Sequence, residues 1–191
     1  MCFKIYNIYF EVDYIFLSLL IIYIACDRTG IYLPLLLSVI IHEFSHILCL
    51  ILFKCKFYSV KLNIGAITIK YNENISKPKK IISILMGPLS NLLISYIGFT
   101  LKNELLIYIN LILAFYNFLP ISGLDGGEII KTVLSGVLND KLIENILNAL
   151  TIIVSTAVLM TCFIFKIFSV YVLLFCVYLI SPLILKNLLK H

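Results

Sequence analysis

Two histidines and a glutamate lie close together in an otherwise apolar stretch, IIHEFSHIL at residues 40–48. His42 and His46 are four residues apart, so on a helix they share one face and can bind one metal ion. Glu43 follows His42, about 100° around the helix, where it can reach a metal-bound water without being a ligand. The spacing is typical of zinc hydrolases, in which the glutamate is the general base.

The alternative interpretation of this pattern is a chance match, in which two buried histidines are merely hydrogen-bonded. The context argues against it, because His191 is the only other histidine and Glu43 is the only acidic residue of the apolar segment 31–53. Ionisable residues inside a membrane segment are costly and mark functional sites. We therefore predict a metal centre at His42, Glu43 and His46.

A catalytic zinc site usually has three protein ligands and one open position, so the histidine pair lacks one ligand. His191 stands at the C-terminal end of the chain and is a poor candidate. Asp125 is a better one, because it lies in the segment NFLPISGLDGG, residues 117–127, between apolar Leu124 and two glycines. A loop with a capping aspartate is the alternative interpretation of this segment.

The same segment contains the residues that let a chain leave helical geometry, Pro120, Gly123, Gly126 and Gly127. Irregular backbone at membrane depth is tolerated where it lines a cavity. We therefore predict that Pro120, Gly123 and Gly126 contribute to substrate binding. The glycine-rich loop 123–127 is expected to form one wall of the path by which water enters.

The elements that position these residues are expected to be membrane-spanning helices. Hydrophobic residues make up 62% of the 191 residues and charged residues 13%, whereas soluble domains are about 45–50% apolar. Each of six apolar segments is near the roughly 20 residues that cross a bilayer. The predicted fold class is an all-α polytopic membrane protein of about six transmembrane helices in a single domain, 1–191. The six segments are 12–26, 31–53, 81–101, 105–120, 142–165 and 167–185.

The distribution of positive charge predicts the orientation of these spans. Six spans place twelve of the 15 Lys and Arg residues on one side and three on the other, so both termini are expected in the cytoplasm. His46 is then about 10 Å of helix from the cytoplasmic end of its span. The segment 105–120 ends on the same side, so the histidine pair and Asp125 approach the same leaflet. No basic cluster is interleaved with aromatic residues, which excludes a nucleic-acid surface.

The loop 54–80 between the second and third spans has a residue pattern typical of β-strands. SVKLNIGAITIKY, residues 59–71, alternates β-branched and polar residues around Gly65, which predicts a small membrane-associated β-hairpin. It is either an ordinary cytoplasmic hairpin or a sheet whose open edge a substrate strand could join. The six cysteines form no C-x-x-C pair and are expected to be small buried hydrophobic residues in a reducing compartment.

Taken together, these motifs resemble those of the site-2 proteases, the M50 family of intramembrane zinc metalloproteases. HEFSH at 42–46 is similar to the first motif of the family, and NFLPISGLDGG at 117–127 to the second. GPLSN at 87–91 is similar to the Gly-Pro and Asn element of the helix between them. The resemblance covers roughly residues 31–130, the expected three-helix core. Ser45 departs from the usual glycine, and Ser122-Gly123 from the common proline.

This resemblance implies a role for each matching residue. His42, His46 and Asp125 would bind one Zn²⁺ per chain, with Glu43 as the general base. Asn117 would donate a hydrogen bond near the scissile carbonyl. Gly87 and Asn91 are four residues apart on the third helix. Either they line the substrate site, or the glycine allows close helix packing while the asparagine forms a hydrogen bond between helices.

The expected function is hydrolysis of a peptide bond in a membrane-associated protein near the cytoplasmic leaflet. Within the family the chain is most similar to the sporulation branch, whose members process a sigma-factor precursor, and neither a PDZ nor a CBS domain is expected. One alternative is a catalytically inactive homologue, which should have lost Glu43 or a ligand. The other is a metal-binding transporter, which should carry polar residues across several spans.

The same resemblance implies the location and the partners of the chain. The location would be a bacterial cell membrane or the membrane around a forespore. The implied partners are a membrane-tethered protein substrate, membrane inhibitor proteins and the lipid bilayer. An oligomer is compatible with the sequence, and nucleic acid is excluded.

Overall fold

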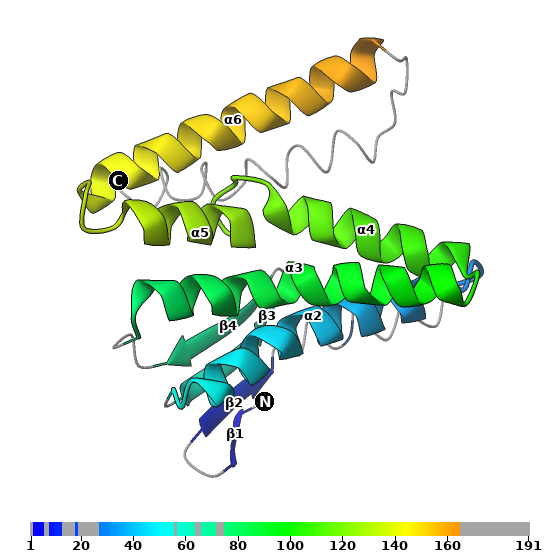
Figure 1. Ribbon diagram of the computed structural model, residues 1–191, viewed down its shortest axis with the longest axis horizontal. Coiled ribbons are helices and arrows are strands. Elements are labelled where there is room, and N and C mark those ends of the chain that lie inside the picture. The colour runs from blue at the N-terminus through cyan, green and yellow to red at the C-terminus, as the bar shows by residue number, and fades with distance from the viewer. Residues whose placement is uncertain are drawn as a thin grey trace. The chain divides into compact units, whose positions relative to one another are not determined.

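The computed structural model of the chain describes residues 2–5, 8–12, 18, 27–55, 57–63, 66–71 and 75–164 (Figure 1). The chain forms two compact units, Met1–Tyr116 and Asn117–His191. The first holds strands β1 to β4, helices α2 (Tyr32–Leu52) and α3 (Lys77–Thr100), and most of α4 (Glu104–Phe118). The second holds α5 (Asp125–Leu134) and α6 (Asp140–Ile164).

Three of the described helices are long and apolar enough to cross a membrane: α2, α3, and Asp140–Cys162 of α6. Helix α4 is apolar but has only 15 residues. These four helices lie where the sequence predicts its second to fifth spans. The predicted spans 12–26 and 167–185 lie outside the described residues, apart from Val12 and Ser18, so six spans stay a prediction.

The four strands form one sheet in the order β1-β2-β3-β4. β1 (Cys2–Ile5) and β2 (Ile8–Val12) are antiparallel, as are β3 (Phe57–Asn63) and β4 (Ala66–Tyr71), while β2 runs parallel to β3. The pair β3–β4 occupies the stretch in which the residue alternation predicts a hairpin. The sequence does not predict β1 and β2, because four or five residues are too few for a clear alternation. The fold is therefore mostly helical, with a sheet to which the N-terminal residues contribute half of the strands.

Asp27 closes the turn that leads into α2. Its carboxylate accepts hydrogen bonds from Thr29 N (2.8 Å), Thr29 Oγ1 (2.7 Å), Gly30 N (2.9 Å) and Tyr32 N (2.9 Å). Partial loss of hydration raises the pKa of this carboxyl, but the four hydrogen bonds lower it by more. The pKa of Asp27 therefore lies below its ordinary value of 3.8.

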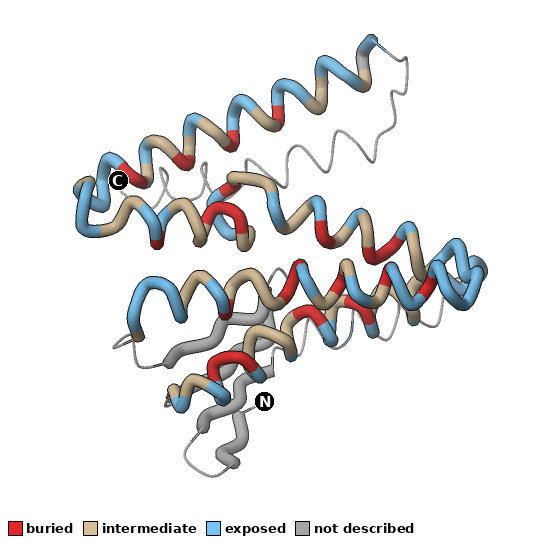
Figure 2. Tube along the Cα trace, viewed as in Figure 1, coloured by how far each residue is buried: buried red, intermediate tan, exposed pale blue. Residues whose placement is uncertain are grey.

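Helices α2 and α3 pack side by side (Figure 1), and small residues form the face of α3 that is buried. Small side chains let two helix backbones approach closely. Large apolar side chains lie on the outer face of α2, where Leu37 and Phe44 are exposed. Buried positions recur along one side of each long helix (Figure 2). The buried residues of α3 are Ser83, Gly87, Pro88, Asn91, Ser95 and Gly98.

Candidate metal centre

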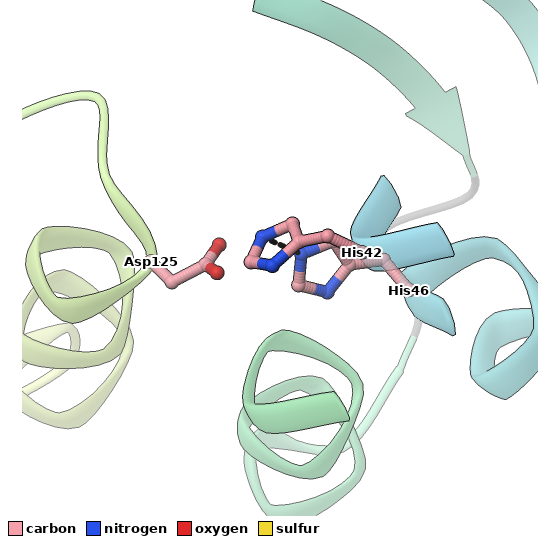
Figure 3. A group of neighbouring side chains, drawn as sticks. All are labelled: His42, His46 and Asp125. Atoms are coloured by element: carbon pink, nitrogen blue, oxygen red, sulfur yellow. Dashed lines mark hydrogen bonds between the residues drawn. The ribbon is translucent and has the colours of Figure 1, made fainter. Parts of the chain in front are cut away.

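The two histidines lie on successive turns of α2, as their spacing predicts. Their rings are edge to face, with centroids 4.9 Å apart and an interplanar angle of 85° (Figure 3). His42 is buried, with 4% of its surface exposed, and His46 is half-buried. Both side chains therefore lie on the inner face of a helix whose outer face is apolar.

Each imidazole uses its Nδ1 atom to contact α3. His42 Nδ1 lies 2.8 Å from Asn91 Oδ1, and His46 Nδ1 lies 2.8 Å from the backbone carbonyl oxygen of Ser83. Carbonyl oxygens only accept hydrogen bonds, so each Nδ1 carries a proton and donates it. In a neutral imidazole the other nitrogen, Nε2, then holds a lone pair. This is the tautomer that a metal ligand needs, fixed in the way that second-shell partners usually fix it.

The two Nε2 atoms face each other at 3.2 Å. Since both nitrogens hold lone pairs, no proton lies between them, and a cation bound to both would offset the repulsion between the two lone pairs. Tetrahedral zinc with bonds of about 2.0–2.1 Å would separate two ligand nitrogens by roughly 3.3 Å. The histidine pair therefore fits a zinc ion in both tautomer and spacing.

Gly87 of α3 lies directly against the rings of both histidines. A Cβ added to Gly87 would lie 2.7 Å from His42 Nε2, and nearer still to His46 Nε2 and Cε1. Real Cβ atoms essentially never approach a neighbour within 3.0 Å. The absent side chain is thus what keeps space beside the two nitrogens.

Three more polar residues accompany the histidines, Glu43 and Ser45 on α2 and Ser83 on α3. Glu43 follows His42 and is half-buried. Ser45, which departs from the usual glycine of the resemblance, donates a hydrogen bond from Oγ to Ile41 O at 2.7 Å and so satisfies its hydroxyl within its own helix. The sequence does not predict a role for Ser83, because its contact with His46 uses a backbone carbonyl that any residue type could supply.

Asp125 lies in the second unit and is the first residue of α5 (Figure 3). It is half-buried, and the start of a helix favours a negative charge. The predicted loop 123–127 is therefore wrong from Asp125 onward, since Gly126 and Gly127 are helical. Tertiary packing explains the difference. A Cβ on Gly126 would lie 2.5 Å from Leu119 O, and one on Gly127 would overlap Ile121 O.

The other residues of the segment 117–127 occupy different surroundings. Asn117 is half-buried on the last turn of α4, and Pro120 is half-buried beyond it. Gly123 is exposed with a φ of +94°, a conformation that favours glycine. Gly126 is buried against backbone atoms of Phe118 and Leu119. Their predicted roles toward a substrate stay predictions.

Residues 101–162 match the profile of peptidase family M50, a region that includes Asp125 but not the histidine pair. A comparison with curated protein sequences finds no match. The solved site-2 protease from Methanocaldococcus jannaschii is similar, with a TM-score of 0.67 and 20% sequence identity, over 94% of this chain and 91% of that chain. The chain has the fold of a site-2 protease.

Proposed function

We propose that this chain is an intramembrane zinc metallopeptidase that hydrolyses a peptide bond of a membrane-associated protein. The observation that carries the proposal is the histidine pair, whose Nδ1 atoms donate to α3 while the Nε2 atoms face each other at 3.2 Å. Long apolar helices, the site-2 protease fold and the match to peptidase family M50 support it.

His42 and His46 would hold the zinc through Nε2, and we assign the third protein ligand to Asp125. Together they offer two imidazole nitrogens and one carboxylate oxygen, a donor set that suits catalytic zinc. When bound, zinc acts as a Lewis acid and lowers the pKa of water toward about 7. The half-buried position of Asp125 at the start of α5 is suited to holding an anionic ligand.

Glu43 is assigned as the general base. It would take a proton from the attacking water and later deliver it to the leaving amine. Asn117 is assigned as a hydrogen-bond donor to the oxygen of the scissile carbonyl, where negative charge develops. Gly87, Pro120 and Gly123 are assigned to the substrate-binding wall. Gly126 shapes that wall indirectly, since it packs against the backbone before α5.

The substrate is proposed to be a membrane-tethered protein that must be unwound locally, because helical peptide bonds are shielded by their own hydrogen bonds. The outer strands of the sheet, β1 and β4, offer backbone groups that an extended segment could join. A sigma-factor precursor is the substrate suggested by the resemblance to the sporulation branch. The proposed setting is a bacterial membrane, with both termini in the cytoplasm and membrane proteins as inhibitors.

The experiment is co-expression of the Glu43→Gln variant with a membrane-tethered precursor. Removing a general base typically lowers the rate about 10²–10⁴-fold, while the zinc content should equal that of the parent. Glu104→Gln is the control, since Glu104 is exposed at the start of α4, and it should cleave normally. A zinc-loaded Glu43→Gln variant that cleaves as fast as the parent would refute the proposal.

A further inference from the structure

Two asparagines, Asn91 on α3 and Asn110 on α4, are completely buried among the described residues. Their amides are used differently. Asn110 donates from Nδ2 to Leu106 O of its own helix at 2.9 Å. Asn91 instead accepts a hydrogen bond on Oδ1 from His42 Nδ1 at 2.8 Å, and its Nδ2 finds no partner within the described part of the chain. The Oδ1 atom of Asn110 likewise finds no partner among the described residues, so Asn91 is distinguished by its contact with His42 and not by an unsatisfied atom.

We propose that Asn91 is a positioning residue of the metal centre rather than a substrate-binding one. By accepting the Nδ1 proton of His42, its Oδ1 atom holds the imidazole in the tautomer whose Nε2 lone pair is available to the metal. The inference rests on the proposed function, because it assigns a task only if His42 is a metal ligand.

The two histidines differ in how their tautomers are held. His46 Nδ1 donates to the carbonyl oxygen of Ser83, which belongs to the backbone and survives any substitution there. His42 Nδ1 depends on a side chain, 49 residues away in the sequence. A single substitution can therefore remove the acceptor that fixes the tautomer of His42, but not the one that fixes the tautomer of His46.

If His42 loses this acceptor, an alternative hydrogen bond becomes available to it. Without an acceptor at Nδ1, its proton is better placed on Nε2, from which it can donate to the lone pair of His46 Nε2 at 3.2 Å. That hydrogen bond would use both nitrogens that the metal needs. His42 is buried, with 4% of its surface exposed, so solvent has little access to replace the missing acceptor. Asn91 thus selects between a pair of metal ligands and a hydrogen-bonded pair.

The test compares zinc affinities of purified full-length variants by competition with a chromophoric chelator. Asn91→Leu removes the acceptor at similar volume, and loss of a second-shell partner should weaken zinc binding about 10–100-fold. Asn91→Asp keeps an acceptor and should bind zinc as tightly as the parent or more tightly. Asn110→Leu is the matched control, and its affinity should stay within about threefold of the parent, as expected for an independent site.

The Nδ1 proton resonance of His42 in the zinc-loaded protein gives a second measurement that does not depend on the leucine variant folding. A carboxylate accepts this proton more strongly than an amide, so Asn91→Asp should move the resonance downfield. An unchanged resonance, or a folded Asn91→Leu variant with parental zinc affinity, overturns the inference. A parent protein that binds no zinc would instead overturn the proposed function, so the two failures are distinguishable.

Discussion

Gly87→Ala is the smallest substitution that should destroy the proposed metal centre. The added methyl group would lie 2.7 Å from His42 Nε2, and nearer to two atoms of the His46 ring. The rings cannot simply rotate away, because rotation breaks the Nδ1 hydrogen bonds to Asn91 and to the Ser83 carbonyl oxygen. Either the imidazoles leave their ligand positions, or α3 moves away from α2.

The expected loss of affinity follows from the number of ligands displaced. Zinc held by four ligands in small structural domains binds with an apparent free energy of about 10–16 kcal/mol, which is about 3 kcal/mol per ligand. Displacing one imidazole should therefore weaken zinc binding about 100-fold, and displacing both about 10⁴-fold. Overpacking should also lower the free energy of unfolding by about 1–3 kcal/mol.

The assay is zinc competition on detergent-purified protein, with thermal unfolding in excess chelator to measure the packing cost alone. Gly98→Ala is the matched control on the same helix. Its Cβ would meet Ile107 N at 3.1 Å and Leu106 Cβ at 3.2 Å, a tight contact that involves neither histidine. Gly98 lies about 16 Å along the helix from Gly87. That variant should lose some stability and keep zinc affinity within about threefold. If Gly87→Ala binds zinc as tightly as the parent, the space beside the two Nε2 atoms is not where the metal binds.

Two further predictions concern residues other than those of α2 and α3. Gly127→Ala should lower the free energy of unfolding by about 1–3 kcal/mol or more, because its Cβ would overlap Ile121 O. Ser122 is exposed, so Ser122→Ala should change the free energy of unfolding by less than about 0.5 kcal/mol. Equal denaturant curves for the two variants would contradict the close packing of Gly127. The depressed pKa of Asp27 means that its contribution to stability is present above pH 3.8 and is lost as the pH falls through the lower folded-state pKa. Melting temperatures taken from about pH 6 to about pH 2 should fall more steeply for the parent than for Asp27→Asn, whereas parallel curves would show that this turn does not contribute.

The sequence is most informative where a feature depends on residues that are near one another along the chain. The i, i+4 spacing of His42 and His46 and the apolar residues around them predict a helix with both side chains on one face, and α2 has that arrangement. Local spacing cannot predict the partners of the two Nδ1 atoms. They come from residues 49 and 37 positions later, and one of them is a backbone oxygen.

Gly126 and Gly127 give a second example of a feature that local sequence cannot predict. Gly126 and Gly127 resemble a loop in sequence because glycine disfavours a helix interior by about 1 kcal/mol. In the structure they are the second and third residues of α5, because only glycine fits against the backbone oxygens of residues 118–121. A tertiary contact therefore overrides the local preference, and it does so next to Asp125, the residue assigned as the third ligand.

The histidine pair also explains how an apolar helix tolerates polar side chains. Of its four ring nitrogens, two donate to acceptors on α3 and two face each other at 3.2 Å. The first two contacts exist only because small residues such as Gly87 let α3 approach α2. A metal ion bound to the last two nitrogens would offset the repulsion between their lone pairs. Close packing of the two helices and metal binding therefore favour each other, since the contacts that align the ligands also hold α2 against α3.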